Sequence, residues 1–169
     1  AIWDKKEQTL FLARDRFGIK PLYYLHLPNK VFAFSSETIS FKQLDSFHRK
    51  INKKNLGLVL EDNLALIGYG YTIFENIFQL LPGHYIHLRK GQAPKQKRWW
   101  STIAHRTDMP ISYKEQVEKF REIFEDACRI RMRSDVPIAS ALSGGLDSSS
   151  VNCTMYHLMN GEKDKTRIP

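Results

Sequence analysis

The sequence VPIASALSGGLDSSSV, residues 136–151, joins an apolar run to a doubled glycine and a polar helix start. The apolar run over 136–142 is typical of a short strand that is covered on both faces, as in a parallel sheet. Gly144 and Gly145 supply a backbone that can turn sharply and approach a ligand closely. Apolar residues then recur at helical spacing, at Val151, Met155, Leu158 and Met159. We therefore expect a buried strand, a tight turn and a helix.

The turn at 143–149 has the features of a phosphate-binding loop. Free backbone N–H groups and the positive end of the helix dipole would face it. Serine hydroxyls at 143, 148 and 149 could donate to phosphate oxygens, and the carboxylate of Asp147 would need a cation such as Mg²⁺ beside phosphate. The nucleotide P-loop is excluded because no lysine stands at its required place. The alternative is a glycine turn whose Asp and Ser only cap a helix.

Length and composition predict a globular chain. Its 169 residues suffice for about one ordinary domain, and 42% of them are hydrophobic. Because the chain starts at Ala1 without methionine and stops soon after a helix, we expect an interior piece of a longer protein. The two cysteines, Cys128 and Cys153, lie in apolar helix patterns without metal-site spacing, which favours buried, reduced thiols in the cytoplasm. We expect no membrane partner, because no apolar run is long enough.

The net charge of +8 raises the question of nucleic acid binding. The basic residues are scattered among acidic ones, and no nucleic-acid motif accompanies them. We expect a solvated surface and no nucleic acid partner.

The first hundred residues show mainly strand patterns. We expect one β-meander with strands at 1–4, 9–13, 21–27 and 31–35, helices at 37–44 and 55–66, and a later strand at 84–88. His84 and His87 would point to opposite faces of that last strand and make a poor metal pair. Trp99 and Trp100 lie in a polar stretch and are expected to be packing anchors rather than a ligand platform.

The string RDRFGIKPLYY, residues 14–24, places four charged residues between apolar strands. Such a group indicates ion pairs at a domain surface or contacts to a charged ligand. A salt-bridged turn is the alternative. The four residues are Arg14, Asp15, Arg16 and Lys20.

A long amphipathic helix is expected at 113–133, with an apolar stripe and a basic end. The arginines in its last turns, at 129, 131 and 133, complement the helix dipole, which we favour over a direct role in binding a phosphate.

Three strings resemble known families. SGGLDSS at 143–149 resembles the pyrophosphate-binding loop of the ATP pyrophosphatase superfamily. RDRFGIKPLYY, followed by FAFSSE at 32–37, resembles the second half of class II glutamine amidotransferases, where the segment faces the partner domain. TIF at 72–74 and LPGHY at 81–85 resemble the glutamine-hydrolysing asparagine synthetases. GMP and NAD synthetases share only the loop, and phosphoribosyl amidotransferases share only the upstream half, so the combination favours the asparagine synthetase family.

The resemblance implies an α+β/α/β chain in three parts. Residues 1–91 would form the C-terminal part of an Ntn-type αββα glutaminase sandwich, and 92–112 a linker. Residues 113–169 would begin a doubly wound parallel ATP-pyrophosphatase domain. Arg14, Asp15, Arg16 and Lys20 would then lie between domains.

The resemblance also implies a reaction. Asparagine would be made from aspartate, ATP and glutamine through a β-aspartyl-AMP intermediate, with AMP, pyrophosphate and glutamate released. ATP and Mg²⁺ would be the cofactors, with Mg²⁺ held by Asp147 through the pyrophosphate. The residues that the resemblance assigns to ATP and pyrophosphate are Ala141, Leu142, Ser143, Gly144, Gly145, Leu146, Asp147, Ser148 and Ser149.

The glutaminase nucleophile of the family is an N-terminal cysteine, so neither Cys128 nor Cys153 can serve. The chain by itself is therefore expected to be inactive. The partners would be small molecules, with a homodimer of the full-length protein left open. Two alternatives remain: an amidotransferase for another carboxylate, in β-lactam, peptide or polysaccharide maturation, or a non-catalytic nucleotide-binding module.

Overall fold

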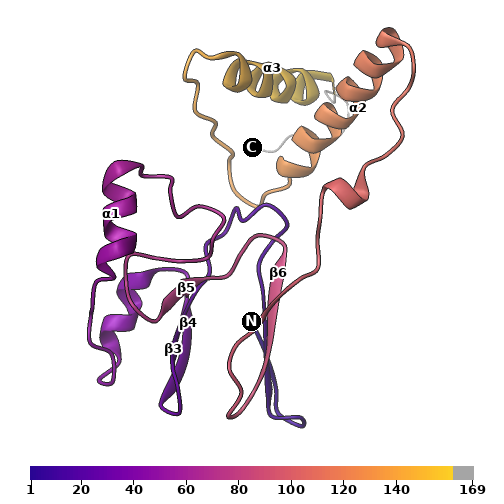
Figure 1. The fold of residues 1–169 in the computed structure, drawn as a ribbon. Helices are drawn as coiled ribbons and strands as arrows, with labels where there is room; N and C mark the ends of the chain where they lie inside the picture. Colours follow the sequence, from indigo (N-terminus) through magenta and orange to yellow (C-terminus); the bar gives the residue numbers. More distant parts are fainter. Residues whose placement is uncertain (162–169) are drawn as a thin grey trace. The chain divides into compact units, whose positions relative to one another are not determined.

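Two antiparallel sheets carry the first part of the chain in the computed structural model, which describes residues 1–161 (Figure 1). The chain divides into two units, Ala1–Arg106 and Thr107–Pro169, and each is described by itself. The end of the predicted second domain, 162–169, lies outside the described residues.

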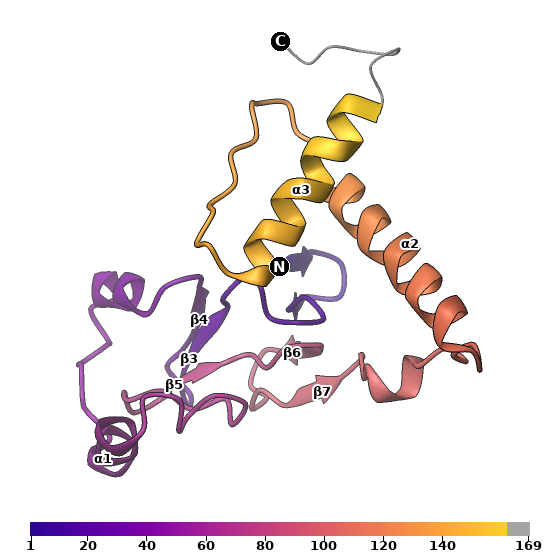
Figure 2. The ribbon, with the colours of Figure 1, turned by 90° about the horizontal axis from the view of Figure 1, so that it is seen from above.

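The four-stranded sheet of the first unit has the order β1-β2-β6-β7. The three-stranded sheet has the order β4-β3-β5, and its strands are labelled in Figures 1 and 2. All pairs are antiparallel. The strands are β1 (Ile2–Asp4), β2 (Thr9–Ala13), β3 (Tyr23–Leu27), β4 (Val31–Ser35), β5 (Ile77–Gln79), β6 (His84–Arg89) and β7 (Gln96–Arg98).

The predicted strands of the first unit exist, but the single meander is wrong. Hairpin β1–β2 belongs to one sheet and hairpin β3–β4 to the other. The intervening loop has Gly18 at φ 71°, and it carries the chain from one sheet to the other. Strand β2 instead pairs with β6, which places Leu12 opposite Ile86. Sequence periodicity identifies strands but not which distant strand each one will pair with.

Strand β3 has buried residues on both faces. Successive side chains of a strand point to opposite sides, so Tyr24 and Leu25 enter different layers of the core. Tyr24 packs with Leu12, Leu80 and Ile86. Leu25, which is fully buried, belongs to a second cluster with Phe41 and Ile77 on the other side. The first unit therefore stacks a four-stranded sheet, a three-stranded sheet and a short helical segment that contains Phe41.

The helical segments of this unit are shorter than the sequence predicted. The expected helix at 37–44 is a 3₁₀ helix, η1 (Thr38–Gln43), and its N-cap residue makes no side-chain capping bond. The expected helix at 55–66 is α1 (Lys53–Glu61). Asn52 starts α1 by accepting from the N–H of Asn55, and Asp62 is already extended and ends it.

The predicted linker, 92–112, contains structure that belongs to the first unit. Its residues from Gln96 to Arg98 form β7 and pair with β6, and a short 3₁₀ helix, η2, covers Ile103–His105. Beyond β7, the N–H groups of Trp99 and Trp100 both donate to the carbonyl of Gly83, at 2.8 and 3.2 Å.

The second unit contains two helices that pack against each other, α2 (Tyr113–Arg131) and α3 (Leu146–Gly161). Ser112 caps α2 by accepting from the N–H of Glu115, whose carboxylate accepts in return from the Ser112 hydroxyl. The predicted long helix is thus confirmed, two residues shorter at its end.

The predicted strand at 136–142 is not formed. Residues 136–142 are exposed, with Val136 65% and Leu142 66% exposed. A parallel strand forms only when its backbone bonds to a neighbouring strand. The described part of the second unit contains helices and no strand with which 136–142 could pair.

The cysteine prediction was half right. Both thiols are free, but only Cys128 is buried, and Cys153 is exposed on α3. Within residues 1–161, no helix combines the length and the apolar character needed to cross a membrane.

We predict that Gly83→Ala destabilises the first unit more than Gly91→Ala does. Both glycines have positive φ, 63° and 80°, so both variants pay the left-handed penalty of about 1–2 kcal/mol. Only at position 83 would the new Cβ meet other atoms, the Cβ and carbonyl oxygen of Trp100, both at 3.1 Å. Urea denaturation should give an extra loss of about 1–3 kcal/mol for Gly83→Ala. Equal losses would contradict the crowding.

Candidate functional site

The loop at 143–145 leads directly into α3, which begins at Leu146. Gly144 has φ 82°, a conformation that residues with side chains rarely adopt, and a Cβ placed there would meet no atom within 4 Å. The doubled glycine therefore forms the predicted tight turn, and its outer side is open.

Several backbone donors at the start of α3 are free. Within residues 1–161, the N–H groups of Gly144, Leu146, Asp147 and Ser148 bond to no protein acceptor. The N–H of Ser149 is the first to enter the helical pattern, donating to the carbonyl of Gly145 at 3.1 Å. These are the groups that a helix start leaves for an anion, and the helix dipole adds to their attraction.

The serine hydroxyls of the loop divide into two kinds. The Oγ atoms of Ser143 and Ser148 lie 2.8 Å apart, and the Ser148 hydroxyl also donates to the carbonyl of Gly145. The Ser149 hydroxyl makes no hydrogen bond with any residue in 1–161. Of the predicted phosphate donors, Ser149 is thus the hydroxyl that remains available.

The loop has the donors that a pyrophosphate group requires. Free N–H groups lie beside a turn without side chains, and Asp147 contributes an exposed carboxylate in the first turn of α3, where a magnesium ion could bind. Ala141 and Leu142 precede the loop but are exposed rather than held in a sheet. The assignment of all nine residues to ATP stays a prediction.

Arg14 is the best-buried charged residue of the first unit and is 8% exposed. Its guanidinium donates to the carbonyls of Lys20 at 2.9 Å, Leu80 at 2.8 Å and Gly18 at 2.8 Å. The side chain therefore ties the loop at 14–20 to the segment before β6. The role of Arg14 between domains stays a prediction, while its described contacts lie within its own unit.

Asp15 organises the same loop from the other side. Its carboxylate accepts from the N–H groups of Phe17, Ile19 and Lys20, at 2.9–3.1 Å. Burial by itself raises the pKa of this carboxyl, but backbone hydrogen bonds outweigh burial and bring the pKa below its ordinary value of 3.8. Those bonds come from Lys20, Ile19, Phe17 and Gly18.

The salt-bridged turn that the sequence left as an alternative is not present among the described residues. Arg14 and Asp15 bond to backbone groups rather than to each other. Arg16 and Lys20 are exposed. The guanidinium of Arg16 lies 4.3 Å from the ring centroid of Trp100, a cation–π contact.

The two tryptophans contact the loop, which fits the packing role expected of them. The indole N–H of Trp99 donates to the carbonyl of Arg14 at 3.3 Å. The Trp100 ring stacks on His105 with centroids 3.9 Å apart.

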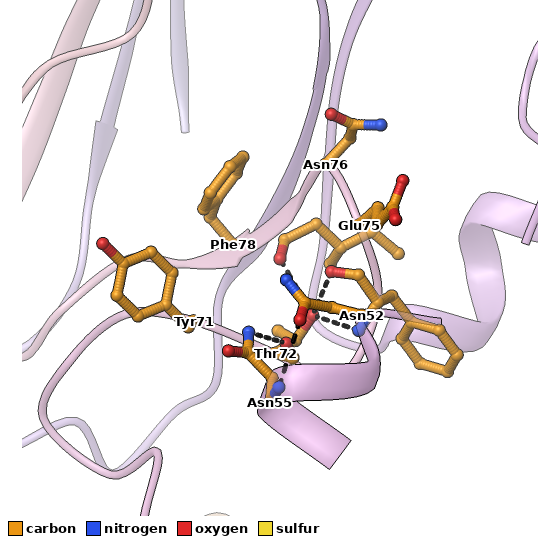
Figure 3. Close-up of a pocket in the computed structure, with 9 residues that line it drawn as sticks. Asn52, Asn55, Tyr71, Thr72, Glu75, Asn76 and Phe78 are labelled. Atoms are coloured by element: carbon orange, nitrogen blue, oxygen red, sulfur yellow. Dashed lines mark hydrogen bonds between the residues drawn. The ribbon is translucent and has the colours of Figure 1, made fainter. Parts of the chain in front are cut away.

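Sequence reasoning missed a pocket of about 290 Å³ at the start of α1 (Figure 3). Its polar groups largely bond to one another: Asn55 donates to the carbonyl of Thr72 at 2.8 Å, and the Thr72 hydroxyl donates to the carbonyl of Ile77 at 2.8 Å. Glu75, another lining residue, forms a salt bridge with Lys50 at 2.9 Å. The hydrogen bond from Asn55 to Thr72 therefore holds the segment before β5 against α1. The sequence signal for this region was Asn52, because an Asn directly before a helical pattern indicates an N-cap and so the start of α1.

No group of three or more metal-binding side chains occurs in the part of the chain that the structure describes. His84 bonds through Nδ1 with the carbonyl of Pro82 at 2.7 Å, in agreement with a structural role.

Comparison with known families defines the class of the chain. Residues 1–100 match the glutamine amidotransferase domain family, so the chain belongs to that family. Residues 119–166 match the asparagine synthase family. The two matches follow the order that the sequence motifs predicted.

Curated relatives agree with this combination. The chain is 36% identical over 152 residues to "Putative asparagine synthetase [glutamine-hydrolyzing] 2" of Methanocaldococcus jannaschii, covering 89% of the chain and 29% of that protein. It is 31% identical over 151 residues to "Asparagine synthetase [glutamine-hydrolyzing] 3" of Bacillus subtilis, covering 89% of the chain and 24% of that protein. It is 33% identical over 165 residues to "Amidase chry2" of Gibberella zeae, covering 94% of the chain and 23% of that protein. These matches confirm the resemblance to glutamine-hydrolysing asparagine synthetases, and the chain spans about a quarter of the length of these relatives.

We predict that Asp15→Asn destabilises the chain near neutral pH and that the difference shrinks in acid. A carboxyl with a lowered pKa in the folded state stabilises that state above its unfolded pKa, and the contribution is lost as the pH falls through the folded pKa, below about 4. Urea denaturation at pH 7, 5, 4 and 3 measures this. Asp45→Asn, an exposed aspartate of the same unit, is the control. A difference between wild type and Asp15→Asn that does not change with pH would contradict the prediction.

Proposed function

We propose that this chain is part of a glutamine-hydrolysing asparagine synthetase, which makes asparagine from aspartate, ATP and glutamine. The observation that carries the proposal is the order of the two family matches, with a glutamine amidotransferase domain followed by an asparagine synthase segment. The free N–H groups at the start of α3 support it further, because they lie within the asparagine synthase match.

The 143–149 loop would bind the pyrophosphate of ATP in the second unit. The N–H groups of Gly144, Leu146 and Asp147 and the hydroxyl of Ser149 would donate to phosphate oxygens, and preorganised donors of this kind stabilise charge that develops in a transition state. The carboxylate of Asp147 would hold Mg²⁺, which when bound offsets the negative charge of the phosphates. Ala141 and Leu142 would border the adenosine. This role assumes an ATP-pyrophosphatase fold, in which 136–142 pairs with neighbouring strands.

The first unit would be the part of the glutaminase domain that does not carry the nucleophile. Its sheets would form part of an Ntn-type sandwich, and the loop at 14–20 would face the synthetase domain through Arg16 and Lys20. Neither cysteine of the chain has a free N-terminal amine beside its thiol, so the chain alone should not hydrolyse glutamine. The protein would act in the cytoplasm on small molecules.

A second candidate is an amidotransferase that acts on another carboxylate. Two relatives favour it: the amidase of Gibberella zeae and "Amidase chyE" of Penicillium rubens, at 33% and 34% identity, each over 94% of the chain. Supplying the full-length protein with aspartate, ATP and glutamine separates the two. Asparagine formation supports the first proposal, and ATP–pyrophosphate exchange that requires a different acceptor supports the second.

We predict that Asp147→Ala in the full-length protein lowers ATP–pyrophosphate exchange by about a hundredfold or more, because the magnesium ligand beside the phosphates is removed. Exchange of labelled pyrophosphate into ATP measures the effect. Asp126→Ala, which removes a surface carboxylate paired with Arg129, should retain exchange. An unchanged rate in Asp147→Ala would refute the assigned role, and a wild type without exchange would favour a non-catalytic module.

A further inference from the structure

Asn152, in the second turn of α3, bonds to both ends of the loop. Its Nδ2 donates to the carbonyl of Ser148 at 2.8 Å and to the carbonyl of Ala141 at 3.4 Å. A primary amide nitrogen carries two hydrogens, so one side chain can make both bonds at once. Ala141 precedes the doubled glycine, and Ser148 lies in the first turn of the helix behind it. The amide therefore bridges the chain before and after the turn.

Ser143 and Ser148 also contact each other across the loop. The N–H of Ser143 donates to the Ser148 hydroxyl at 3.3 Å, and the two hydroxyl oxygens lie 2.8 Å apart. Among residues 1–161, these contacts and the Asn152 bond are the hydrogen bonds that join 136–143 to α3. Of these bonds, the one from Asn152 is the contact that reaches Ala141, the residue two positions before Ser143.

A loop with two glycines has much conformational freedom to lose. If it were free before a ligand arrived, the cost of ordering it would be subtracted from the binding free energy. The bonds of Asn152 reduce that cost, because they fix the separation between the two ends of the turn. They also leave the N–H groups of Gly144, Leu146 and Asp147 unoccupied.

We propose that Asn152 is a positioning residue that holds the 143–149 loop in its anion-binding shape before phosphate binds. This inference rests on the proposed function of the loop and deepens it. Asn152 lies outside the S-G-G-x-D-S-S string and does not itself bind the ligand. It acts by keeping Ala141 and Ser148 at a fixed separation.

The same helix offers a matched control. Asn160 donates through Nδ2 to the carbonyl of Tyr156 at 3.0 Å, a bond of the same kind as that between Asn152 and Ser148. Asn160 has no bond to the loop among the described residues. Alanine at either position favours helix, so both variants preserve α3. A difference between the two variants therefore reports the bond to Ala141 rather than helix stability.

The first test needs no activity and uses the whole 169-residue chain. In wild type and in Asn160→Ala, ¹⁵N relaxation should give Gly144 and Gly145 order parameters near about 0.85, whereas Asn152→Ala should lower them toward about 0.6. Asn152→Asp keeps the shape of the side chain but cannot donate, and it should act in the same direction. Equal order parameters in all four proteins would overturn the proposal.

The second test uses the full-length protein and ATP–pyrophosphate exchange. Asn152→Ala should raise KM for ATP about three- to tenfold while kcat changes less than about twofold, because the lost bonds order the loop equally for substrate and transition state. Asn160→Ala should stay within about twofold on both. If wild type exchanges and the two alanine variants are alike, the proposal fails while the proposed function stands. If wild type does not exchange, the proposed function fails and the order parameters still decide the role of Asn152.

Discussion

Burial of strand β3 on both faces is the constraint on which the first unit depends. Because Tyr24 points into one core layer and Leu25 into the other, a sheet must cover one face and a helical segment the other. The four-stranded sheet supplies the first cover through Leu12 and Ile86, and η1 supplies Phe41 to the second. The loop at 14–20 makes this stacking possible, since it carries the chain out of β2 and into the other sheet.

That loop is held by a buried cation that binds carbonyl oxygens instead of a carboxylate. Arg14 satisfies three carbonyls of irregular backbone that would otherwise be left without donors, and Asp15 satisfies N–H groups of the same loop. Irregular backbone lacks the partners that a sheet provides, so two charged side chains take the place of sheet pairing. The charge-rich string thus serves the fold of its own unit, whatever surface it presents.

The local structure could largely be predicted from the sequence, and the pairing could not. Short apolar runs between turn residues identified β2 and β4, and Asp147 was correctly placed at a helix start. The partnership of β2 with β6 joins segments far apart in the sequence, and no local pattern encodes it. The apolar run at 136–142 reads as a buried strand but is exposed, because a parallel strand depends on neighbours that its own residues do not specify. In the site, the motif predicted the free N–H groups, while Asn152 lies beyond the motif and is found only from its contacts.

Because the two thiols differ in exposure, the second unit can be labelled chemically at one cysteine. Cys153 follows Asn152 directly and is exposed on α3, whereas Cys128, on α2, is buried. A maleimide or spin label would therefore react at position 153 in preference to 128 in the native chain. The probe would then report on the 143–149 loop from about one helical turn away, without any engineered cysteine.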